Sequence, residues 1–493
     1  MKQLRTFPQA VVSRKAAASI GRGHPWVFDA EVRRIEPAPS DGRVAVNGDL
    51  VDVLDEKGGY LGTGLLSEQS KIRVRLVSRN ANDRFDEAFW ERKLRWAWDY
   101  RVATMGGRAL PGAEPDTSCC RVVFSEADAF PGLVIDRYED VLVSETLTFG
   151  MERLRPLLLP MAVRVLREAG QDVRAVYERN DAAVREKEGL PRYKGFFELP
   201  AELTTPLAGE PAGEELTRVG AGAQGAGKLA DAGAQGAGQL ADAAGEGITR
   251  VGAGSSVISD QVAGNAGVLP APSTHRVICE NGVRYELDLE NSQKTGFFLD
   301  QKYNRRAVAR LARGRRVLDC FTHVGSFALN CALAGAEFVR GVDVSAMAVD
   351  LCRRNARLNG VADRADFTVA NVFDYLPGLE ADHGKAAGGP FDLIVLDPPA
   401  FTKSRRTAAE AARGYRQINY RAMRLLPRGG YLATCSCSHF MPADKLREVL
   451  AEAAHDAGVQ LRQVEERQQA PDHPIVYGIP ESEYLKFFVF QVI

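Results

Sequence analysis

The stretch FDLIVLDPPAF, residues 391–401, joins a run of four apolar residues directly to an acid and two prolines. Such a short apolar run is typical of a strand buried on both faces of a parallel sheet. Pro398 and Pro399 fix the backbone after Asp397 in a stiff loop that could hold a planar base against its face. A turn that merely ends a strand is the alternative.

Strand-like and helix-like segments alternate around this stretch over residues 274–493. Helical patterns cover residues 325–335 and 346–358. The other strand-like runs read RRVLDCF, FVRGVDVS, DFTVAN, GGYLATCSCS and YLKFFVFQV. This alternation predicts an α/β domain with a doubly wound, Rossmann-like sheet, in which ligands bind outside the carboxyl ends of the strands.

Polar residues and a glycine follow the first three of these strands. Asp319 and Gly325 follow the first, Asp343 ends the second and Asn371 follows the third. An acid at the second position can accept hydrogen bonds from both ribose hydroxyls, and an amide at the third suits an adenine edge. The missing GxGxxG motif counts against a dinucleotide. Each residue alone could be an ordinary loop polar group, but the ordered set predicts a nucleotide-like cofactor.

The N-terminal part of the chain has a different pattern. Residues 1–78 alternate short apolar runs with glycine turns, which predicts a small β-barrel. Residues 79–205 combine strand-like runs with helical patterns at 83–107 and 152–168, which predicts an α+β middle domain.

Residues 206–273 are rich in glycine and alanine and contain no aromatic residue. The sequence AGAQGAGKLAD at 221–231 is followed at once by AGAQGAGQLAD at 232–242. Such a segment cannot bury enough apolar surface to offset its ordering entropy. The composition predicts a disordered insertion.

Overall composition excludes several classes of protein. The 493 residues carry a net charge of −1, so RNA binding would need local basic patches. Eight irregularly spaced cysteines do not indicate a disulfide framework. No signal-peptide pattern and no apolar run of about 18 residues is found, which predicts a cytoplasmic protein without a membrane span.

Motifs along nearly the whole chain identify a resemblance, the 206–273 insertion excepted. They read RGHPWVF, FPGLVIDRY, YERNDAAVREKEGL, QKTGFFLDQKYNR, VLDCF, VDVS, DPPAF, RGYRQIN, TCSCS and RQQAPDHPI. Together they resemble the bacterial 23S rRNA cytosine-5 methyltransferases that carry an N-terminal PUA domain. The resemblance implies S-adenosylmethionine as the cofactor, large-subunit rRNA as the substrate, and a homodimer.

The same resemblance implies which residues contact the cofactor: Gln301, Asp319, Asp343, Asn371 and Asp397. Two positions depart from the family pattern. Asn371 stands where aspartate is usual, and Ala400 stands where many members have lysine after the two prolines. Lys403 could replace that lysine.

A cysteine pair lies in ATCSCSH, residues 433–439. Methylation of cytosine carbon 5 needs a thiolate that adds to carbon 6. The loop after Asp397 has no cysteine, so the candidate lies here. Spacing alone cannot decide which cysteine is the nucleophile, because Cys435 and Cys437 share a strand face. The family pattern T-x-S-C-S and the position nearer the strand end select Cys437 as nucleophile, with Asp397 bonding the base edge, and leave Cys435 for packing.

Other interpretations of the pair are weaker. No second cysteine pair lies nearby to complete a zinc site, so no metal is predicted. A disulfide across C-x-C would be strained and is unexpected in the cytosol. Both cysteines could also be purely structural.

Two basic clusters are candidate RNA contacts. Lys71, Arg73 and Arg75 alternate along one predicted strand, and a merely solvated strand face is the alternative. Lys403, Arg405 and Arg406 follow the two prolines and are placed to hold phosphates near the target base.

Two further functions compete with cytosine-5 methylation. Loops of the Asp-Pro-Pro kind also serve methyl transfer to an exocyclic nitrogen of adenine or guanine, in which case Cys437 would be idle. A non-catalytic RNA-binding protein that keeps the fold is the second alternative.

Overall fold

The computed structural model describes residues 6–106, 115–205, 273–292, 294–382, 384, 388–402 and 405–493. The predicted insertion therefore lies outside the described residues, except for Ser273, and so does Lys403. Within the described ranges, no helix is both long and apolar enough to cross a membrane.

A seven-stranded sheet forms the C-terminal part, with the order β16-β15-β14-β17-β18-β20-β19. Its strands are β14 (Arg316–Cys320), β15 (Phe338–Asp343), β16 (Ala365–Val369), β17 (Leu393–Leu396), β18 (Tyr431–Ser436), β19 (Leu461–Arg467) and β20 (Lys486–Val492). The first five in this order run parallel, whereas β20 is antiparallel to both of its neighbours. All four β17 residues are buried, as expected for a central strand covered on both faces.

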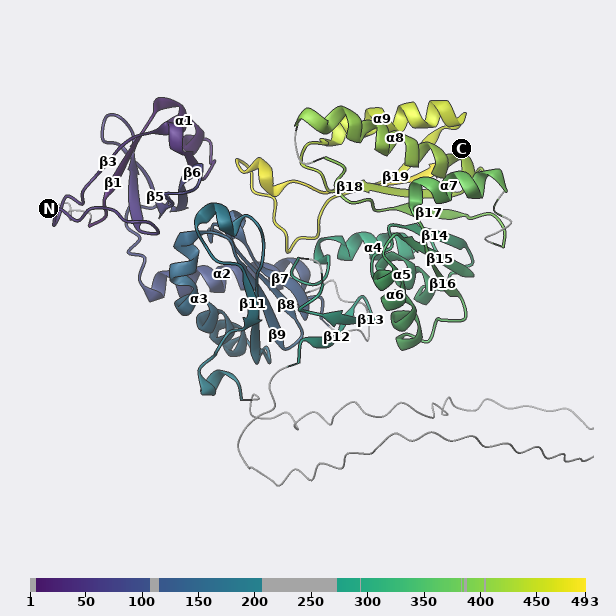
Figure 1. The fold of residues 1–493 in the computed structure, drawn as a ribbon, viewed down its shortest axis with the longest axis horizontal. Helices are drawn as coiled ribbons and strands as arrows, with labels where there is room; N and C mark the ends of the chain where they lie inside the picture. The colour runs from purple at the N-terminus through teal and green to yellow at the C-terminus, as the bar shows by residue number, and fades with distance from the viewer. Residues whose placement is uncertain are drawn as a thin grey trace, which may run out of the picture. The chain divides into compact units, whose positions relative to one another are not determined.

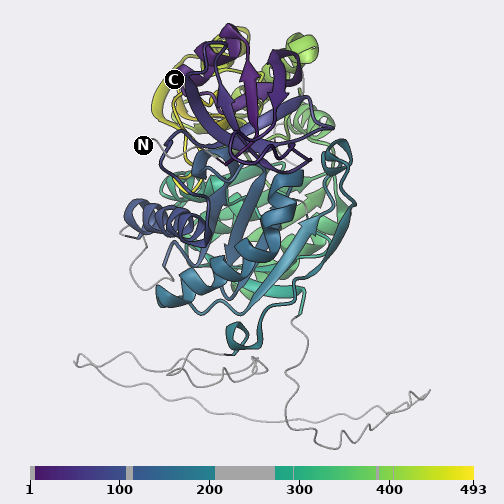
Figure 2. The same cartoon turned by 90° about the vertical axis from the view of Figure 1, so that its left-hand side faces the viewer.

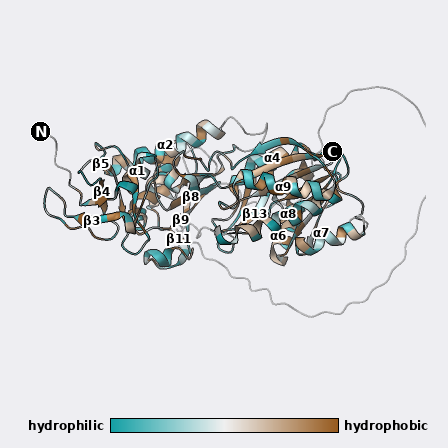
Figure 3. Ribbon diagram, turned by 90° about the horizontal axis from the view of Figure 1, so that it is seen from above, coloured by the Kyte–Doolittle hydropathy of each residue, from teal (hydrophilic) through white to brown (hydrophobic). Residues whose placement is uncertain are grey.

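Helices cover both faces of this sheet. They are α4 (Lys302–Ala309), α5 (Ser326–Leu333), α6 (Ala346–Leu358), α7 (Val372–Ala381), α8 (Ala408–Leu425) and α9 (Ala443–Ala457). Figure 1 shows α5 and α6 on one side and α8 and α9 on the other, and each side has its own apolar core. Figure 3 shows the hydropathy of these elements. The predicted doubly wound α/β fold is confirmed.

The N-terminal residues form a six-stranded sheet with the order β2-β6-β5-β4-β1-β3. Its elements are β1 (Gln9–Val12), α1 (Arg14–Gly21), β2 (Trp26–Phe28), β3 (Val32–Glu36), β4 (Leu50–Leu54), β5 (Tyr60–Leu66) and β6 (Ile72–Ser78). A small apolar core built around Val27, Val53 and Val74 holds it together.

A five-stranded sheet with the order β11-β10-β9-β8-β7 follows. Its elements are α2 (Glu87–Met105), β7 (Cys119–Phe124), β8 (Leu133–Tyr138), β9 (Val141–Thr146), α3 (Phe149–Glu168), β10 (Ala175–Asn180) and β11 (Tyr193–Phe196). Figure 2 shows the blue helices α2 and α3 against this sheet. A hairpin of β12 (His275–Glu280) and β13 (Val283–Asp288) then leads to the C-terminal sheet. The boundaries at residues 78, 205 and 273 stay predictions.

Arg75 corrects one expectation about the basic residues of β6. The residue is 7% exposed, and its guanidinium lies 2.8 Å from the carboxylate of Glu188, which is also buried. Ser67 donates a hydrogen bond to the other oxygen of the same carboxylate at 2.7 Å. The charge of Arg75 is thus used inside the protein, which argues against its predicted contact with RNA.

We expect Arg75→Met to destabilise the fold rather than to weaken RNA binding. The substitution leaves the Glu188 carboxylate buried without its cation, and such a loss costs about 3–5 kcal/mol. Urea unfolding measures the effect. Lys71→Met is the matched control, because Lys71 is exposed and its loss should stay within about 0.5 kcal/mol. Equal stability of the two variants would contradict the interpretation of this ion pair.

Candidate active site

Asp319 lies at the carboxyl side of β14 and is fully buried. Its Oδ2 accepts hydrogen bonds from the Thr322 hydroxyl at 2.5 Å and from the Ala328 amide at 2.9 Å. Its Oδ1 has no partner within the described part of the chain. Burial raises the pKa of this carboxyl to about 7. An unpartnered buried acceptor fits a ligand that brings an ammonium or hydroxyl donor.

The loop from β14 to α5 is tightly wound. Phe321, His323 and Gly325 all have positive φ angles, of 63°, 54° and 84°. Left-handed backbone is uncommon for residues other than glycine and often marks a ligand-binding loop. A Cβ on Gly325 would meet Leu329 and Phe367 atoms at 3.3 Å, so glycine suits both the conformation and the space.

Asp343 and Asn371 lie at the carboxyl ends of the next two strands. The Asp343 carboxylate accepts hydrogen bonds from the amides of His323 at 3.0 Å and Ser345 at 2.9 Å. The bond from His323 holds the Asp343 carboxylate next to the loop between β14 and α5. Asn371 is exposed and caps α7 by accepting from the Phe373 amide at 3.1 Å. Val344, which is 73% exposed, leaves apolar surface beside Asp343 that suits the face of a planar ring.

Asp397 follows β17, and its carboxylate bonds side chains from β18 and from the residue before α4. Its Oδ1 accepts hydrogen bonds from the thiol of Cys435 at 2.8 Å and from the amide of Gln301 at 3.1 Å. Burial raises its pKa to about 6, although these two hydrogen bonds act in the opposite direction. At pH 7 the carboxyl is therefore mostly ionised, and roughly a tenth of it carries a proton. Cys435 packs in the core as expected, but its contact with Asp397 was not predicted.

Cys437 follows the last residue of β18 and is half-buried against the core on that side of the sheet. Burial and the nearby carboxylate of Asp397 raise the pKa of its thiol to about 11, whereas Lys294 acts to lower it. The thiol is thus largely protonated at neutral pH. It needs an added cation or an approaching substrate to react as a thiolate.

Asp300 is a further acid at this site, and we did not predict it from the sequence. Tyr484 donates a hydrogen bond to its Oδ2 at 2.7 Å, and the buried Oδ1 has no partner among the described residues. Burial acts to raise its pKa, but interactions with His473 and Lys294 outweigh that effect and lower it.

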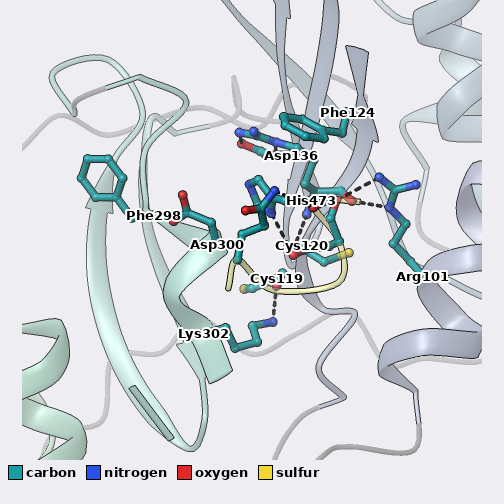
Figure 4. Close-up of polar contacts among 12 residues, drawn as sticks. Arg101, Cys119, Cys120, Phe124, Asp136, Phe298, Asp300, Lys302 and His473 are labelled. Atoms are coloured by element: carbon teal, nitrogen blue, oxygen red, sulfur yellow. Dashed lines mark hydrogen bonds and ion pairs between the residues drawn. The ribbon is translucent and has the colours of Figure 1, made fainter. Parts of the chain in front are cut away.

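A polar network fixes the segments that carry Asp300 (Figure 4). Asp472 accepts a hydrogen bond from the Arg121 amide at 2.9 Å and lies 2.9 Å from the His473 ring nitrogen. Arg101 donates to the backbone oxygen of Asp472 at 2.9 Å, and Lys302 donates to the backbone oxygen of Cys119. These bonds tie β7 to both the 467–475 segment and the start of α4, so the site has a rigid support.

The remaining predicted residues are less informative. The side chain of Arg405 lies outside the described residues, and Arg406 is exposed. Lys71 is exposed, whereas Arg73 pairs with Asp29 at 2.5 Å. No cluster of three or more potential metal ligands occurs in the part of the chain that the structure describes.

Comparisons with known proteins agree with this geometry. Residues 267–490 match the family model of S-adenosylmethionine-dependent methyltransferases, and residues 11–79 match a PUA-like domain. A putative S-adenosylmethionine-dependent methyltransferase from Streptococcus mutans has a similar fold, with a TM-score of 0.65, 17% identity, and coverage of 98% of this chain and 99% of that one. Fold and site thus define an S-adenosylmethionine-dependent methyltransferase with a PUA-like domain.

Two relatives with a known name identify the family within this class of methyltransferases. Ribosomal RNA large subunit methyltransferase I of Shewanella amazonensis is 34% identical over 477 residues, which cover 96% of each chain. The protein of the same name from Serratia proteamaculans is 32% identical over 475 residues, again 96% of each. The chain belongs to the ribosomal RNA large subunit methyltransferase I family, as its motifs led us to expect.

Proposed function

We propose that the protein methylates carbon 5 of a cytosine in large-subunit ribosomal RNA, with Cys437 as the nucleophile. The names of the relatives support the RNA substrate. The observation that carries the chemistry is a half-buried thiol and an acid with a raised pKa, Asp397, at the ends of the adjacent strands β18 and β17. A methyltransferase that acts on a nitrogen has no need of that thiol.

The cofactor would be held along the carboxyl ends of β14, β15 and β16. The unpartnered Oδ1 of Asp319 would accept from its ammonium group, Asp343 from its ribose hydroxyls, and Asn371 would bond its adenine. Gly325 would let the backbone approach it, and Gln301 would hold Asp397 beside it. S-adenosylmethionine supplies an electrophilic methyl group on a sulfonium.

Cys437 and Asp397 would act on the base together. The Cys437 thiolate forms a bond from Sγ to carbon 6, and the displaced electron pair moves through the ring to N3, which takes the proton of Asp397. Carbon 5 thereby becomes nucleophilic and accepts the methyl group. Loss of the carbon-5 proton to a base and return of the N3 proton to Asp397 then restore the ring and expel the thiolate.

RNA binding would use cations near the site and on the PUA-like domain. Arg406, Arg405 and Lys403 follow the Asp397 loop, and Lys71 and Arg73 lie at β6. The homodimer and the cytoplasmic location stay predictions.

A trapping experiment tests the covalent step. RNA that contains 5-azacytidine should form a stable adduct with the protein when S-adenosylmethionine is present, because nitrogen at position 5 carries no proton to lose. Denaturing gel electrophoresis detects the adduct, and peptide mass spectrometry should locate it on Cys437. Methylation of the unmodified RNA without any adduct would favour transfer to an exocyclic nitrogen. Neither an adduct nor methylation would favour a binding protein.

A further inference from the structure

Lys486 is a buried cation to which the proposed reaction gives no role. It is the first residue of β20, and it lies opposite Ser436, the last residue of β18, in their antiparallel register. Its side chain is only 6% exposed. Burying an ammonium group is costly unless its charge is used, so a lysine at this place needs an explanation.

The hydrogen bonds of Lys486 leave its charge without a counterion. Its Nζ donates to the backbone oxygens of Ser438 at 2.6 Å and Tyr484 at 2.8 Å. Both acceptors are neutral, and no carboxylate lies within ion-pair distance among the described residues. An ammonium has three donors, so these two bonds leave one unused. Lys486 is therefore held at both neighbours of Cys437. Its backbone lies opposite Ser436, and its ammonium bonds the backbone oxygen of Ser438.

We propose that Lys486 is a positioning residue for Cys437, whose thiolate its ammonium charge stabilises. The two carbonyl bonds hold the ammonium at the backbone that follows β18. When the thiol ionises, its proton passes to water and the positive charge stays on Lys486. The role in catalysis rests on the function proposed above, whereas the effect on the thiol does not.

The charges around both groups agree with this role. Asp397 and Asp300 act to raise the pKa of the Cys437 thiol, whereas Lys294 and, to a smaller extent, Lys486 act to lower it. Burial lowers the pKa of Lys486 to about 8, while the two thiols and Glu483 act in the other direction. Lys294 is exposed and solvent weakens its effect, so the buried Lys486 should be the more effective cation.

The test measures alkylation of Cys437 by iodoacetamide in the full-length protein, without RNA or cofactor. Peptide mass spectrometry follows this cysteine alone. If Lys486→Met raises the thiol pKa by about one unit, the thiolate fraction falls about tenfold, and higher intrinsic nucleophilicity partly offsets the loss. Alkylation at pH 7 should therefore slow roughly threefold to tenfold. Lys445→Met, an exposed lysine on α9, should change nothing.

The pH dependence separates an electrostatic role from a structural one. Lys486 loses its charge near pH 8, so the ratio of wild-type to Lys486→Met rates should fall towards one above that pH. Lys486→Arg keeps its charge and should retain fast alkylation at pH 9 and above. A ratio that does not change with pH would overturn the proposal, and so would equal rates for wild type and Lys486→Met at pH 7.

These outcomes are independent of the proposed function. Should Cys437→Ala retain full methylation while the alkylation results hold, Cys437 would not be the catalytic nucleophile, but its coupling to Lys486 would stand. Should Lys486→Met prove unfolded by circular dichroism, the comparison of Lys486→Arg with wild type above pH 8 decides the matter. In that comparison, equal rates would overturn the proposal.

Discussion

Replacing Cys437 by alanine is expected to lower the methylation rate by on the order of 10⁴-fold or more, because removal of a covalent nucleophile closes the reaction path. Asp397 and the acids that we propose bind the cofactor are untouched, so calorimetry should find unchanged affinity for S-adenosylmethionine. Transfer of tritiated methyl groups to RNA measures the rate. Cys437→Ser keeps the shape of the side chain and should be equally inactive.

Cys279→Ala is the matched control, since Cys279 is also a half-buried cysteine but lies on β12. Its rate should stay within about twofold of wild type. Cys435→Ala should mainly lower stability, because Cys435 is fully buried in the core, with a smaller effect on turnover through its hydrogen bond to Asp397. A Cys437→Ala protein that keeps more than a tenth of the wild-type rate would refute the covalent path.

Replacing Asp343 by alanine is expected to weaken binding of S-adenosylmethionine roughly 30- to 700-fold. A hydrogen bond to a charged group contributes about 1.5–3 kcal/mol. Losing the ribose bonds should then cost about 2–4 kcal/mol, and every 1.4 kcal/mol is a factor of ten in the dissociation constant. Isothermal titration calorimetry measures the constant directly.

Two further variants test whether a loss of affinity is specific to the Asp343 carboxylate. Asp350→Ala removes an exposed acid of α6 that pairs with Arg353, and it should bind the cofactor as wild type does. Asp343→Asn keeps one acceptor oxygen and should fall between alanine and wild type. Unchanged affinity in Asp343→Ala would mean that the cofactor lies elsewhere.

Local pattern was sufficient to predict much of the C-terminal fold. The helix expected at 346–358 is α6 with the same bounds, because Ser345 caps it and its apolar positions repeat at helical spacing. The acids at 319, 343 and 397 lie at the carboxyl ends of their strands, and these ends meet at one edge of a parallel sheet.

Contacts between distant segments could not be predicted in this way. Alternation along β6 indicates that Arg75 shares a face with Arg73, but not that Glu188, 113 residues later, covers it. The same limit applies to Lys486, which reaches the backbone beside Cys437 only because β20 pairs with β18. Asp300 belongs to the site through Tyr484 and the 467–475 segment, which no local pattern connects to it.

Nucleoside mass spectrometry tests the central claim most directly. Large-subunit ribosomal RNA from cells that lack the corresponding gene would be incubated with the protein and S-adenosylmethionine bearing a deuterated methyl group. After digestion to nucleosides, we expect the label in 5-methylcytidine alone, and no label when the protein carries Cys437→Ala. Label on an exocyclic nitrogen of adenosine or guanosine, or label in 5-methylcytidine that persists with Cys437→Ala, would contradict the account.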